Sequence, residues 1–141
     1  DNRFIFFSNY NSPKSIQFKE HEQITAVIFW QNINTQIRLK SIIKKLPNSY
    51  SDKYFLKRSP EKNALAISSN QSNEISSYSE VKKKYEEVYT KDNLNNRPAY
   101  WGGFQFTPYY FEFWKGHASR INKREAYELN NQLWLKKYLE P

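Results

Sequence analysis

The sequence contains no cysteine and no methionine, and it has only 3 glycines and 2 histidines among 141 residues. Without cysteine the chain cannot form a disulfide, use a thiol nucleophile or bind zinc or iron–sulfur clusters through sulfur. His21 and His117 lie far apart with no pattern of carboxylates around them, so we predict no metal site. The lack of cysteine also fits a reducing compartment, and we expect a cytoplasmic protein.

The missing methionine predicts that the chain, which begins at Asp1, is a fragment or a processed form of a longer protein. Residues 1–8 read as the second half of a β-hairpin, with D-N-R before the β-rich run F-I-F-F-S, and the partner strand is expected upstream. No apolar run approaches the roughly 20 residues of a membrane-spanning helix, and no charged-then-apolar leader comes first. We therefore expect no membrane partner.

The chain carries a formal net charge of +8 and 18% aromatic residues, a combination that also occurs in nucleic-acid-binding proteins. Of its 22 basic residues, however, 16 are lysines, several in solvated runs such as residues 82–84. Phenylalanine and tyrosine follow a strand-like alternation instead. We expect no nucleic-acid partner and keep a nucleic-acid-binding barrel only as a second alternative.

The length fits one domain, and the residue pattern predicts mainly β-structure with flanking helices. Strands are expected at residues 3–8, 24–30, 36–46, 104–107, 110–114 and 132–138. Helices are expected at residues 13–22, 50–58 and 79–89, and a Ser/Asn/Gln-rich loop at residues 68–78. Short connections between the first strands favour an antiparallel barrel or sheet.

Several details of these elements are specific enough to test. The continuous apolar run at residues 24–30 predicts a strand buried on both faces. In the next strand, alternation places Ile37, Leu39 and Ile42 on one side and Arg38 and Lys40 on the other. We also expect Ser12 to cap the first helix, Ser49 or Ser51 to cap the second, and Pro60 to end that second helix.

Four motifs near the C-terminus identify a resemblance. They are W-G-G-F at residues 101–104, E-F-W-K-G at 112–116, R-I-N-K-R at 120–124 and L-E-P at 139–141. In this order and spacing they resemble the C-terminal third of the pyridoxine/pyridoxamine 5'-phosphate oxidase family, and the rest of the chain matches that family in order. The resemblance implies an antiparallel split β-barrel that binds FMN in a cleft between the subunits of a homodimer.

It also implies a domain organisation and a set of site residues. Residues 1–141 would form a single FMN-binding split-barrel domain without its N-terminal strand or strands, and residues 99–141 the family's C-terminal dimerisation and active-site region. The cofactor-binding residues implied are Phe7, Ser8, Lys14, Gln36, Gln71, Ser72, Trp114 and Arg124. The substrate-binding residues implied are Tyr54, Arg58, Lys62, Arg120 and Asn122, of which Arg120 and Asn122 are the catalytic candidates.

These residue types suit the chemistry, because basic side chains neutralise phosphate and amides can hydrogen-bond the edge of a flavin ring. The Y-x-x-x-R spacing of Tyr54 and Arg58 predicts that both lie on one helical face. The sequence departs from the family at five positions. They are Pro13 for a basic residue, Lys62 for serine, Leu65 for glycine, Gln105 for arginine and Asn122 for histidine.

The resemblance implies an FMN-dependent oxidase that converts pyridoxamine or pyridoxine 5'-phosphate to pyridoxal 5'-phosphate with O₂. Such a reaction requires no nucleophile, which agrees with the lack of any triad or carboxylate pair in the sequence. The alternative is a flavin-binding split barrel with another substrate, as in phenazine-pathway oxidases, or with no activity on B6 vitamers. Pro13, Lys62 and Asn122 favour this alternative.

Overall fold

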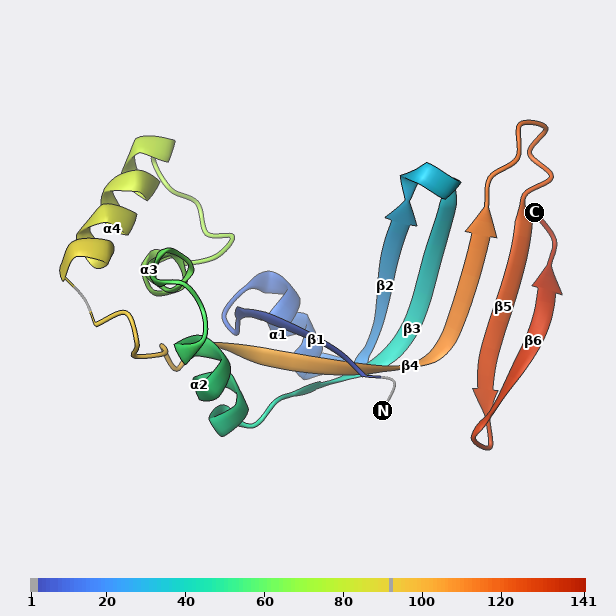
Figure 1. The fold of residues 1–141 in the computed structure, drawn as a ribbon, viewed down its shortest axis with the longest axis horizontal. Helices are drawn as coiled ribbons and strands as arrows, with labels where there is room; N and C mark the ends of the chain where they lie inside the picture. The colour runs from blue at the N-terminus through green and yellow to red at the C-terminus, as the bar shows by residue number, and fades with distance from the viewer. Residues whose placement is uncertain (1–2, 92) are drawn as a thin grey trace. The chain divides into compact units, whose positions relative to one another are not determined.

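The computed structural model describes residues 3–91 and 93–141, so the first two residues of the predicted half-hairpin at residues 1–8 lie outside the described residues. The strands are β1 (Phe4–Asn9), β2 (Gln23–Trp30), β3 (Thr35–Lys45), β4 (Trp101–Lys115), β5 (Lys123–Asn130) and β6 (Leu133–Leu139) (Figure 1). The helices are α1 (Pro13–Glu20), α2 (Asn48–Leu56), α3 (Pro60–Ser68) and α4 (Tyr78–Lys91), and a short 3₁₀ turn, η1 (Gln31–Ile33), precedes β3. The predicted mainly β character with flanking helices is confirmed.

The strands form one six-stranded sheet in the order β2-β3-β4-β5-β6, with β1 paired to β4. The β2–β3, β4–β5 and β5–β6 pairs are antiparallel. The described chain divides into two compact units. Unit 1 contains residues 3–4, 21–43 and 106–141, and unit 2 contains residues 5–20, 44–91 and 93–105.

In unit 1 the strand β3 has an apolar side and a polar side, because successive residues of a strand point to opposite faces of the sheet. On the apolar face of β3, Ile37, Leu39 and Ile43 are buried. The predicted alternation is therefore confirmed for Ile37 and Leu39 and is wrong for Ile42. That side chain lies on the side of Arg38 and Lys40, an even number of residues away from both.

The prediction that residues 24–30 are buried on both faces is wrong for the single chain. Val27, Phe29 and Trp30 in β2 are each more than half exposed, at 57%, 55% and 51%. The reason is topological: within the part of the chain that the structure describes, β2 pairs with β3 alone and is an edge strand. The apolar composition of this segment indicated burial, but most of its side chains are exposed in the described residues.

The C-terminal half of unit 1 differs from expectation in two ways. Two predicted strands at residues 104–107 and 110–114 are a single strand of 15 residues, β4, which continues through Pro108. The ladder to β5 begins only at Tyr110, so the missing N–H of Pro108 breaks none of its bonds. The strand β5 was missed, because its sequence K-R-E-A-Y-E-L-N is rich in residues that are depleted in strands.

The β5–β6 hairpin is closed by Asn131 and Gln132, which both have positive φ angles, of 47° and 69°. Two such residues in a two-residue loop are typical of the type I′ turn, whose twist matches that of the flanking strands. Figure 1 shows the two strands side by side. The prediction of a strand at residues 132–138 is confirmed by β6.

Unit 2 is built around buried aromatic side chains of α2, β4 and the residue that follows β1. Phe55 is fully buried, and Tyr10, Trp101 and Phe104 are exposed by 7% or less. Two glycines of the W-G-G-F motif allow this packing: a Cβ atom on Gly102 would lie 2.1 Å from the Tyr10 hydroxyl, and one on Gly103 would lie 2.6 Å from Leu46 Cδ1. The glycines are therefore needed for close approach.

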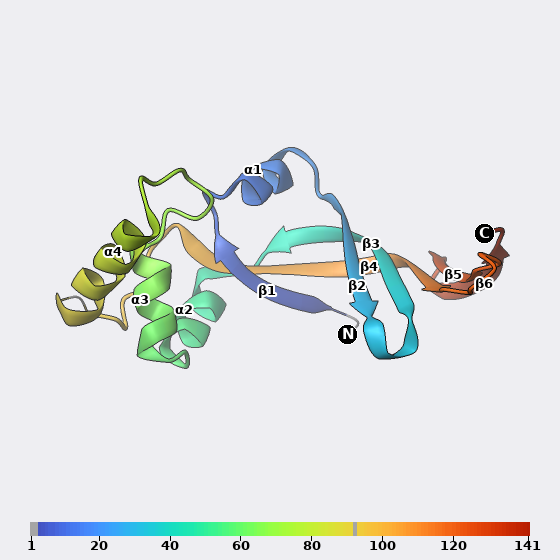
Figure 2. The same cartoon turned by 90° about the horizontal axis from the view of Figure 1, so that it is seen from above.

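The helices of unit 2 correct two predictions. Pro60 does not end the second helix, because α2 already ends at Leu56; it opens α3, with Ser59 before it, in the position that proline favours at a helix start. The residue before α2 is Pro47, which offers no side-chain cap. Ser51 lies inside α2 instead, where its buried hydroxyl accepts a hydrogen bond from the Gly103 amide at 3.0 Å. The amphipathic helix at residues 79–89 is confirmed by α4, which packs beside α3 (Figure 2).

One arginine links the segment before β4 to α2. The Arg97 side chain is only 8% exposed, and its Nε donates to Asp52 Oδ1 at 2.6 Å. Its Nη1 donates to the backbone carbonyls of Pro98 and Trp101, and its Nη2 to Asn48 Oδ1. These bonds fix the start of β4, and with it the position of Trp101.

Candidate functional site

Unit 2 contains a pocket of about 520 Å³ that we call the aromatic–cation pocket. It collects aromatic side chains from β1, α2 and β4 and two basic side chains from the α2–α3 region. Its lining residues are Ile5, Phe6, Phe7, Tyr50, Tyr54, Arg58, Lys62 and Trp101. The three residues that the resemblance assigns to substrate phosphate, Tyr54, Arg58 and Lys62, thus line one cavity.

A stack of parallel rings forms one wall of this pocket. The rings of Tyr54 and Phe7 are stacked and nearly parallel, with centroids 3.7 Å apart and an angle of 4° between their planes. Phe7 in turn stacks on Trp101, with ring centroids 5.3 Å apart. The Arg58 guanidinium lies over the Trp101 ring at 4.3 Å, a cation–π contact that fixes the plane of the guanidinium. The wall is therefore rigid, flat and electropositive at one end.

One nitrogen of the Arg58 guanidinium donates a hydrogen bond, and another has no partner among the described residues. Its Nη2 donates to the Lys62 carbonyl at 2.9 Å, whereas the buried Nη1 has no hydrogen-bond partner among the described residues. Burial lowers the pKa of Arg58, and the nearby Tyr54 partly opposes this. An unpaired, desolvated guanidinium donor is costly in an empty protein and is well suited to an anionic ligand.

The structure corrects how Tyr54 and Arg58 come together. We predicted that both lie on one helical face, but α2 ends at Leu56, and Arg58 lies in the turn that follows. The two side chains still line the same pocket, because the α2–α3 turn directs Arg58 back towards Trp101. The spacing therefore predicted the proximity for the wrong geometric reason.

A second pocket of about 290 Å³ in unit 2 shares Phe7, Arg58, Lys62 and Trp101 with the first. Its lining adds Ser8 and Gln71, two predicted cofactor-binding residues. The amide oxygen of Gln71 accepts from the Ser8 hydroxyl at 3.1 Å and from the Asn9 amide at 3.2 Å. With its oxygen engaged, Gln71 offers its NH₂ group as a donor.

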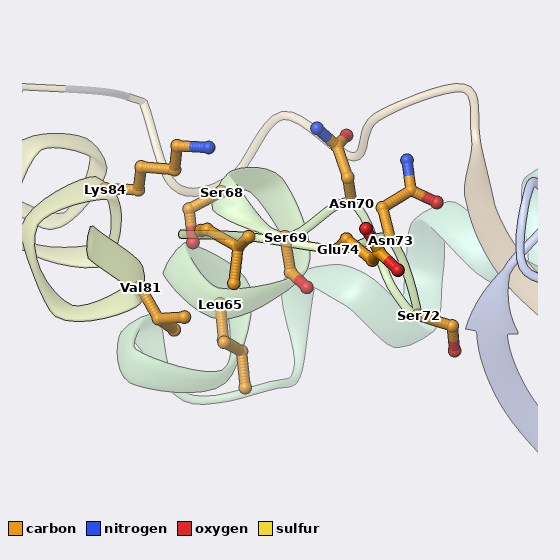
Figure 3. Close-up of a pocket in the computed structure, with 10 residues that line it drawn as sticks. Leu65, Ser68, Ser69, Asn70, Ser72, Asn73, Glu74, Val81 and Lys84 are labelled. Carbon is orange, nitrogen blue, oxygen red and sulfur yellow. The ribbon is translucent and has the colours of Figure 1, made fainter. Parts of the chain in front are cut away.

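Two other predicted cofactor-binding residues of unit 2 are placed differently. Ser72 has a positive φ of 70° and lines a cavity of about 200 Å³ between α3, the following loop and α4. Figure 3 shows the residues that line this cavity, with Lys84 on one side of the view, Leu65 between and Ser72 in the loop on the other side. Lys14 is half-buried in the first turn of α1.

In unit 1 a charged cluster occupies the polar face of the sheet. Glu112 on β4 is buried at 4% exposure, and its Oε1 accepts from Arg124 Nε at 2.8 Å. Arg38 Nη1 lies 3.7 Å from the same oxygen, and the Tyr110 hydroxyl donates to Oε2 at 3.2 Å. Arg38 Nε also donates to Gln36 Oε1 at 2.6 Å.

The hydrogen bond from Arg124 and, less strongly, the charge of Arg38 hold the pKa of Glu112 below its usual value, although burial works against them. The same contact raises the pKa of Arg124. Burial, followed by the charge of Glu112, raises the pKa of Tyr110. The cluster is therefore charged throughout the physiological range, with the carboxylate shared by two guanidinium groups.

Three predicted cofactor-binding residues share this face. Gln36 lies two residues from Arg38 on β3, and Trp114 lies two residues from Glu112 on β4. Trp114 is directly opposite Arg124 in the β4–β5 register. Gln36, Trp114 and Arg124 therefore stand on one side of the sheet around Glu112.

The catalytic candidates of unit 1 lie in or beside the β4–β5 turn. Arg120 is exposed and has a positive φ of 63°. Asn122 is half-buried, and its Oδ1 accepts from the His117 amide at 3.0 Å, so its side chain braces the turn. The nearby Gly116 amide donates to the Asn34 carbonyl at 3.0 Å, which ties the turn to the β2–β3 connection.

Sequence reasoning missed three residues that organise these sites. Trp101 and Glu112 lie inside quoted motifs but were given no role, and Arg38 was treated only as a surface residue of an alternating strand. A glutamate flanked by aromatic residues in a strand was an available signal, because an acidic side chain is seldom fully buried without a partner. No comparable signal predicted that Arg38 contacts Gln36.

None of the helices within residues 3–91 and 93–141 combines the length and the apolar character that a bilayer crossing demands.

Comparison with known proteins gives a family profile and relatives whose descriptions agree with one another. A family profile described as the pyridoxine 5'-phosphate oxidase C-terminal dimerisation region matches residues 101–141. Pyridoxine/pyridoxamine 5'-phosphate oxidase 1 of Hydrogenovibrio crunogenus is 34% identical over 142 residues, covering 98% of this chain and 66% of the relative. The pyridoxine/pyridoxamine 5'-phosphate oxidase of Actinobacillus pleuropneumoniae serotype 5b is 35% identical, covering 99% of this chain and 68% of the relative. The chain thus spans about two thirds of the length of these relatives.

Two solved structures are similar in fold. One is PhzG from Burkholderia lata 383 in complex with tetrahydrophenazine-1-carboxylic acid, with a TM-score of 0.82 and 25% identity over 97% of this chain and 68% of that chain. The other is a pyridoxamine 5'-phosphate oxidase-related, FMN-binding protein from Nostoc punctiforme, with a TM-score of 0.76 and 12% identity over 99% of this chain and 73% of that chain. These likenesses confirm the predicted split-barrel fold. Taken with the near full-length similarity to the curated oxidases, they show that the chain belongs to the pyridoxine/pyridoxamine 5'-phosphate oxidase family.

Proposed function

We propose that the chain acts as an FMN-dependent oxidase that converts pyridoxamine or pyridoxine 5'-phosphate to pyridoxal 5'-phosphate with O₂. The observation that carries the proposal is the aromatic–cation pocket, which Tyr54, Arg58 and Lys62 line together. The charges of Arg58 and Lys62 would neutralise a phosphate group bound in this pocket. The family membership supports the same reaction class.

The donor set of the described residues fits FMN. Gln71 and Gln36 each have their amide oxygen engaged by a neighbouring donor, so both offer NH₂ groups to the carbonyl and ring-nitrogen acceptors of a flavin. We assign Phe7, Ser8 and Ser72 to the ring region as well, and Trp114 to its flat face. Lys14 and Arg124 would neutralise the FMN phosphate.

The residues of this chain have to bind the substrate, orient its ring and shield it from solvent. Arg58 and Lys62 hold the substrate phosphate by charge, and the Tyr54 hydroxyl adds a hydrogen bond. Arg120 and Asn122 contact the pyridine ring. When bound, FMN supplies the redox chemistry, in which the substrate's C4' carbon loses a hydride and O₂ is reduced to H₂O₂. For the pyridoxamine form, water adds at C4' and ammonia leaves.

The proposal includes a homodimer. The family profile that matches residues 101–141 is described as a dimerisation region, and β2 exposes an apolar surface. We assign residues 1–141 to one FMN-binding split-barrel domain and residues 99–141 to its dimerisation and active-site region. A cytoplasmic location is part of the same proposal, in keeping with the absence of cysteine.

A second candidate is an oxidase of another anionic ring compound. The observation that favours it is Lys62, which adds a second cation to a pocket that already contains Arg58. PhzG is described with a carboxylated ring compound, and a carboxylate could use the same two cations. The two candidates share the cofactor and differ in the anionic group of the substrate.

The test is to add FMN to the purified chain, remove unbound flavin and record the visible spectrum. A retained flavin spectrum, together with H₂O₂ and pyridoxal 5'-phosphate formed from pyridoxamine 5'-phosphate, is the expected result. Retained flavin without turnover of either phosphorylated vitamer would favour the second candidate. A chain that retains no flavin would contradict both.

A further inference from the structure

The charged cluster of unit 1 contains two groups that have no role in the proposed function. Arg38 and Glu112 are not assigned to any ligand, yet they join two side chains that are. One carboxylate oxygen, Glu112 Oε1, lies 2.8 Å from Arg124 Nε and 3.7 Å from Arg38 Nη1. Arg38 then reaches Gln36 Oε1 through its Nε, at 2.6 Å. The carboxylate is therefore the common anchor for Gln36 and Arg124.

The contact between Arg38 and Gln36 determines which end of the amide is available. An arginine side chain only donates hydrogen bonds, so the atom of Gln36 that faces Arg38 must be the oxygen. The NH₂ end is then the part left for a ligand. Without Arg38, rotation about the last side-chain torsion would let Gln36 present either an acceptor or a donor.

The anchor itself is well fixed. Glu112 is 4% exposed, and its second oxygen accepts from the Tyr110 hydroxyl at 3.2 Å. Both carboxylate oxygens are thus occupied, so the side chain has little freedom to release Arg38. Arg38, by contrast, has a side chain that is 43% exposed, so replacing it should disturb the fold only slightly.

We infer that Arg38, held by Glu112, is a positioning residue that keeps Gln36 as a hydrogen-bond donor towards an acceptor on the edge of the FMN ring. The inference rests on the proposed function, because it requires Gln36 to contact the flavin. It adds a specific role for two residues that touch no ligand themselves. It also predicts the direction of the bond, from protein to flavin.

The experiment is a double-mutant cycle on FMN affinity in the full chain, using Arg38→Met, Gln36→Ala and the double variant. Flavin fluorescence quenching gives the dissociation constants. Each single change should weaken binding by about tenfold, the effect of losing one hydrogen bond. The double variant should bind no more weakly than Gln36→Ala, because Arg38 acts through Gln36. The absorption maximum of bound flavin should shift equally in the two single variants.

Lys40→Met is the matched control, since Lys40 also projects a cation from the polar face of β3 and lies over the Tyr110 ring at 4.8 Å. It should leave FMN affinity within about twofold of the unaltered chain, the size expected for an exposed charge. Equal losses in Arg38→Met and Lys40→Met would overturn the inference, since they would indicate a general charge effect. The inference would also be overturned if the fold-loss of FMN affinity in the double variant equalled the product of the two single fold-losses. If the unaltered chain binds no FMN, the proposed function fails, and this inference with it.

Discussion

Arg58 is held by two contacts that fix its guanidinium in place. It stacks on Trp101, donates to the Lys62 carbonyl and keeps a buried Nη1 without a partner among the described residues. The stacking and the backbone bond fix the guanidinium before any ligand arrives, so little side-chain entropy remains to be lost on binding. Lys62 lines the same pocket as a mobile charge on a flexible stem.

Replacing Arg58 should therefore discriminate between phosphorylated and unphosphorylated substrates. We expect Arg58→Met, which keeps an apolar stem, to raise the KM for pyridoxamine 5'-phosphate by about tenfold to a hundredfold, since a charged hydrogen bond contributes about 1.5–3 kcal/mol. The KM for pyridoxamine should change little. Lys62→Ser should raise the first KM by less than about tenfold, because an exposed charge is screened. Equal losses on both substrates would contradict a phosphate role for Arg58.

Glu112 should make the stability of the protein depend on pH. Its pKa in the folded state is depressed, chiefly by the Arg124 hydrogen bond, below the value of about 4.3 typical of unfolded chains. The stabilisation is thus fully present above that unfolded value and is lost as the pH falls through the lower, folded pKa. We expect Glu112→Gln to reduce the free energy of unfolding by about 2 kcal/mol at pH 7, and the difference from the unaltered chain to shrink below pH of about 4.

Urea unfolding at a series of pH values measures this effect. Glu128→Gln is the matched control, because Glu128 pairs with Lys137 on the next strand and its side chain is 52% exposed. Its effect should be much smaller than that of Glu112→Gln, because an exposed ion pair is screened by solvent. A pH-independent difference for Glu112→Gln would show that the loss comes from packing and not from charge.

At the scale of elements, periodicity predicted most of the secondary structure. Strongly patterned segments such as β3 and α4 were found close to their predicted bounds. The failures have separate physical causes. The strand β5 has low β-propensity and is held by its neighbours β4 and β6, which no local pattern reveals. The helix α3 begins at Pro60, because proline can open a helix as well as follow one, and the sequence alone does not distinguish the two.

The candidate site likewise contains residues that the sequence predicted and contacts that it did not predict. The polar residues of the aromatic–cation pocket, Tyr54, Arg58 and Lys62, were predicted from the family resemblance, and the structure brings them together. The contacts of Arg38 and Glu112 depend on the register of β3, β4 and β5, which is a property of the folded sheet. Sequence patterns give the residues of such a cluster but not their partners.

The W-G-G-F motif should tolerate no side chain at its first glycine. A Cβ on Gly102 would lie 2.1 Å from the Tyr10 hydroxyl and 2.7 Å from Tyr10 Cζ, and the Tyr10 ring is buried and stiff. We expect Gly102→Ala to lower the free energy of unfolding by about 2–3 kcal/mol, as overpacking does. Urea unfolding provides the measurement.

Gly116→Ala provides the control for this prediction. Its added Cβ would meet Asn34 Nδ2 at 2.4 Å, but the Asn34 side chain is exposed and can rotate away. The cost should stay below about 1 kcal/mol. If Gly116→Ala were as destabilising as Gly102→Ala, close packing against Tyr10 would not be the reason for the glycine.

For the molecule as a whole, the proposed homodimer should depend on β2. Phe29 is 55% exposed and lies opposite Gln36 in the β2–β3 register, so it shares the polar face of the sheet with a proposed flavin contact. We expect Phe29→Lys to shift the protein from dimer to monomer in light scattering at micromolar concentration, because a buried unpaired charge is costly. FMN affinity should fall in parallel.

Thr25→Lys adds the same charge to the same face of β2, at an exposed polar position opposite Lys40. This variant should remain a dimer with nearly unchanged FMN affinity. A Phe29→Lys variant that is as dimeric as the unaltered chain would mean that the subunits meet elsewhere.

The exposed edge of β2 also has a consequence for how the protein is obtained. Residues 24–30, I-T-A-V-I-F-W, contain no charge, proline or glycine, and within the described chain β2 leaves one edge unpaired. Such a segment is a template for pairing with identical strands and for fibril growth. Until something covers that edge, self-association of refolding chains competes with native assembly. The yield of refolded protein should therefore fall as the protein concentration rises, and the lost material should bind thioflavin T.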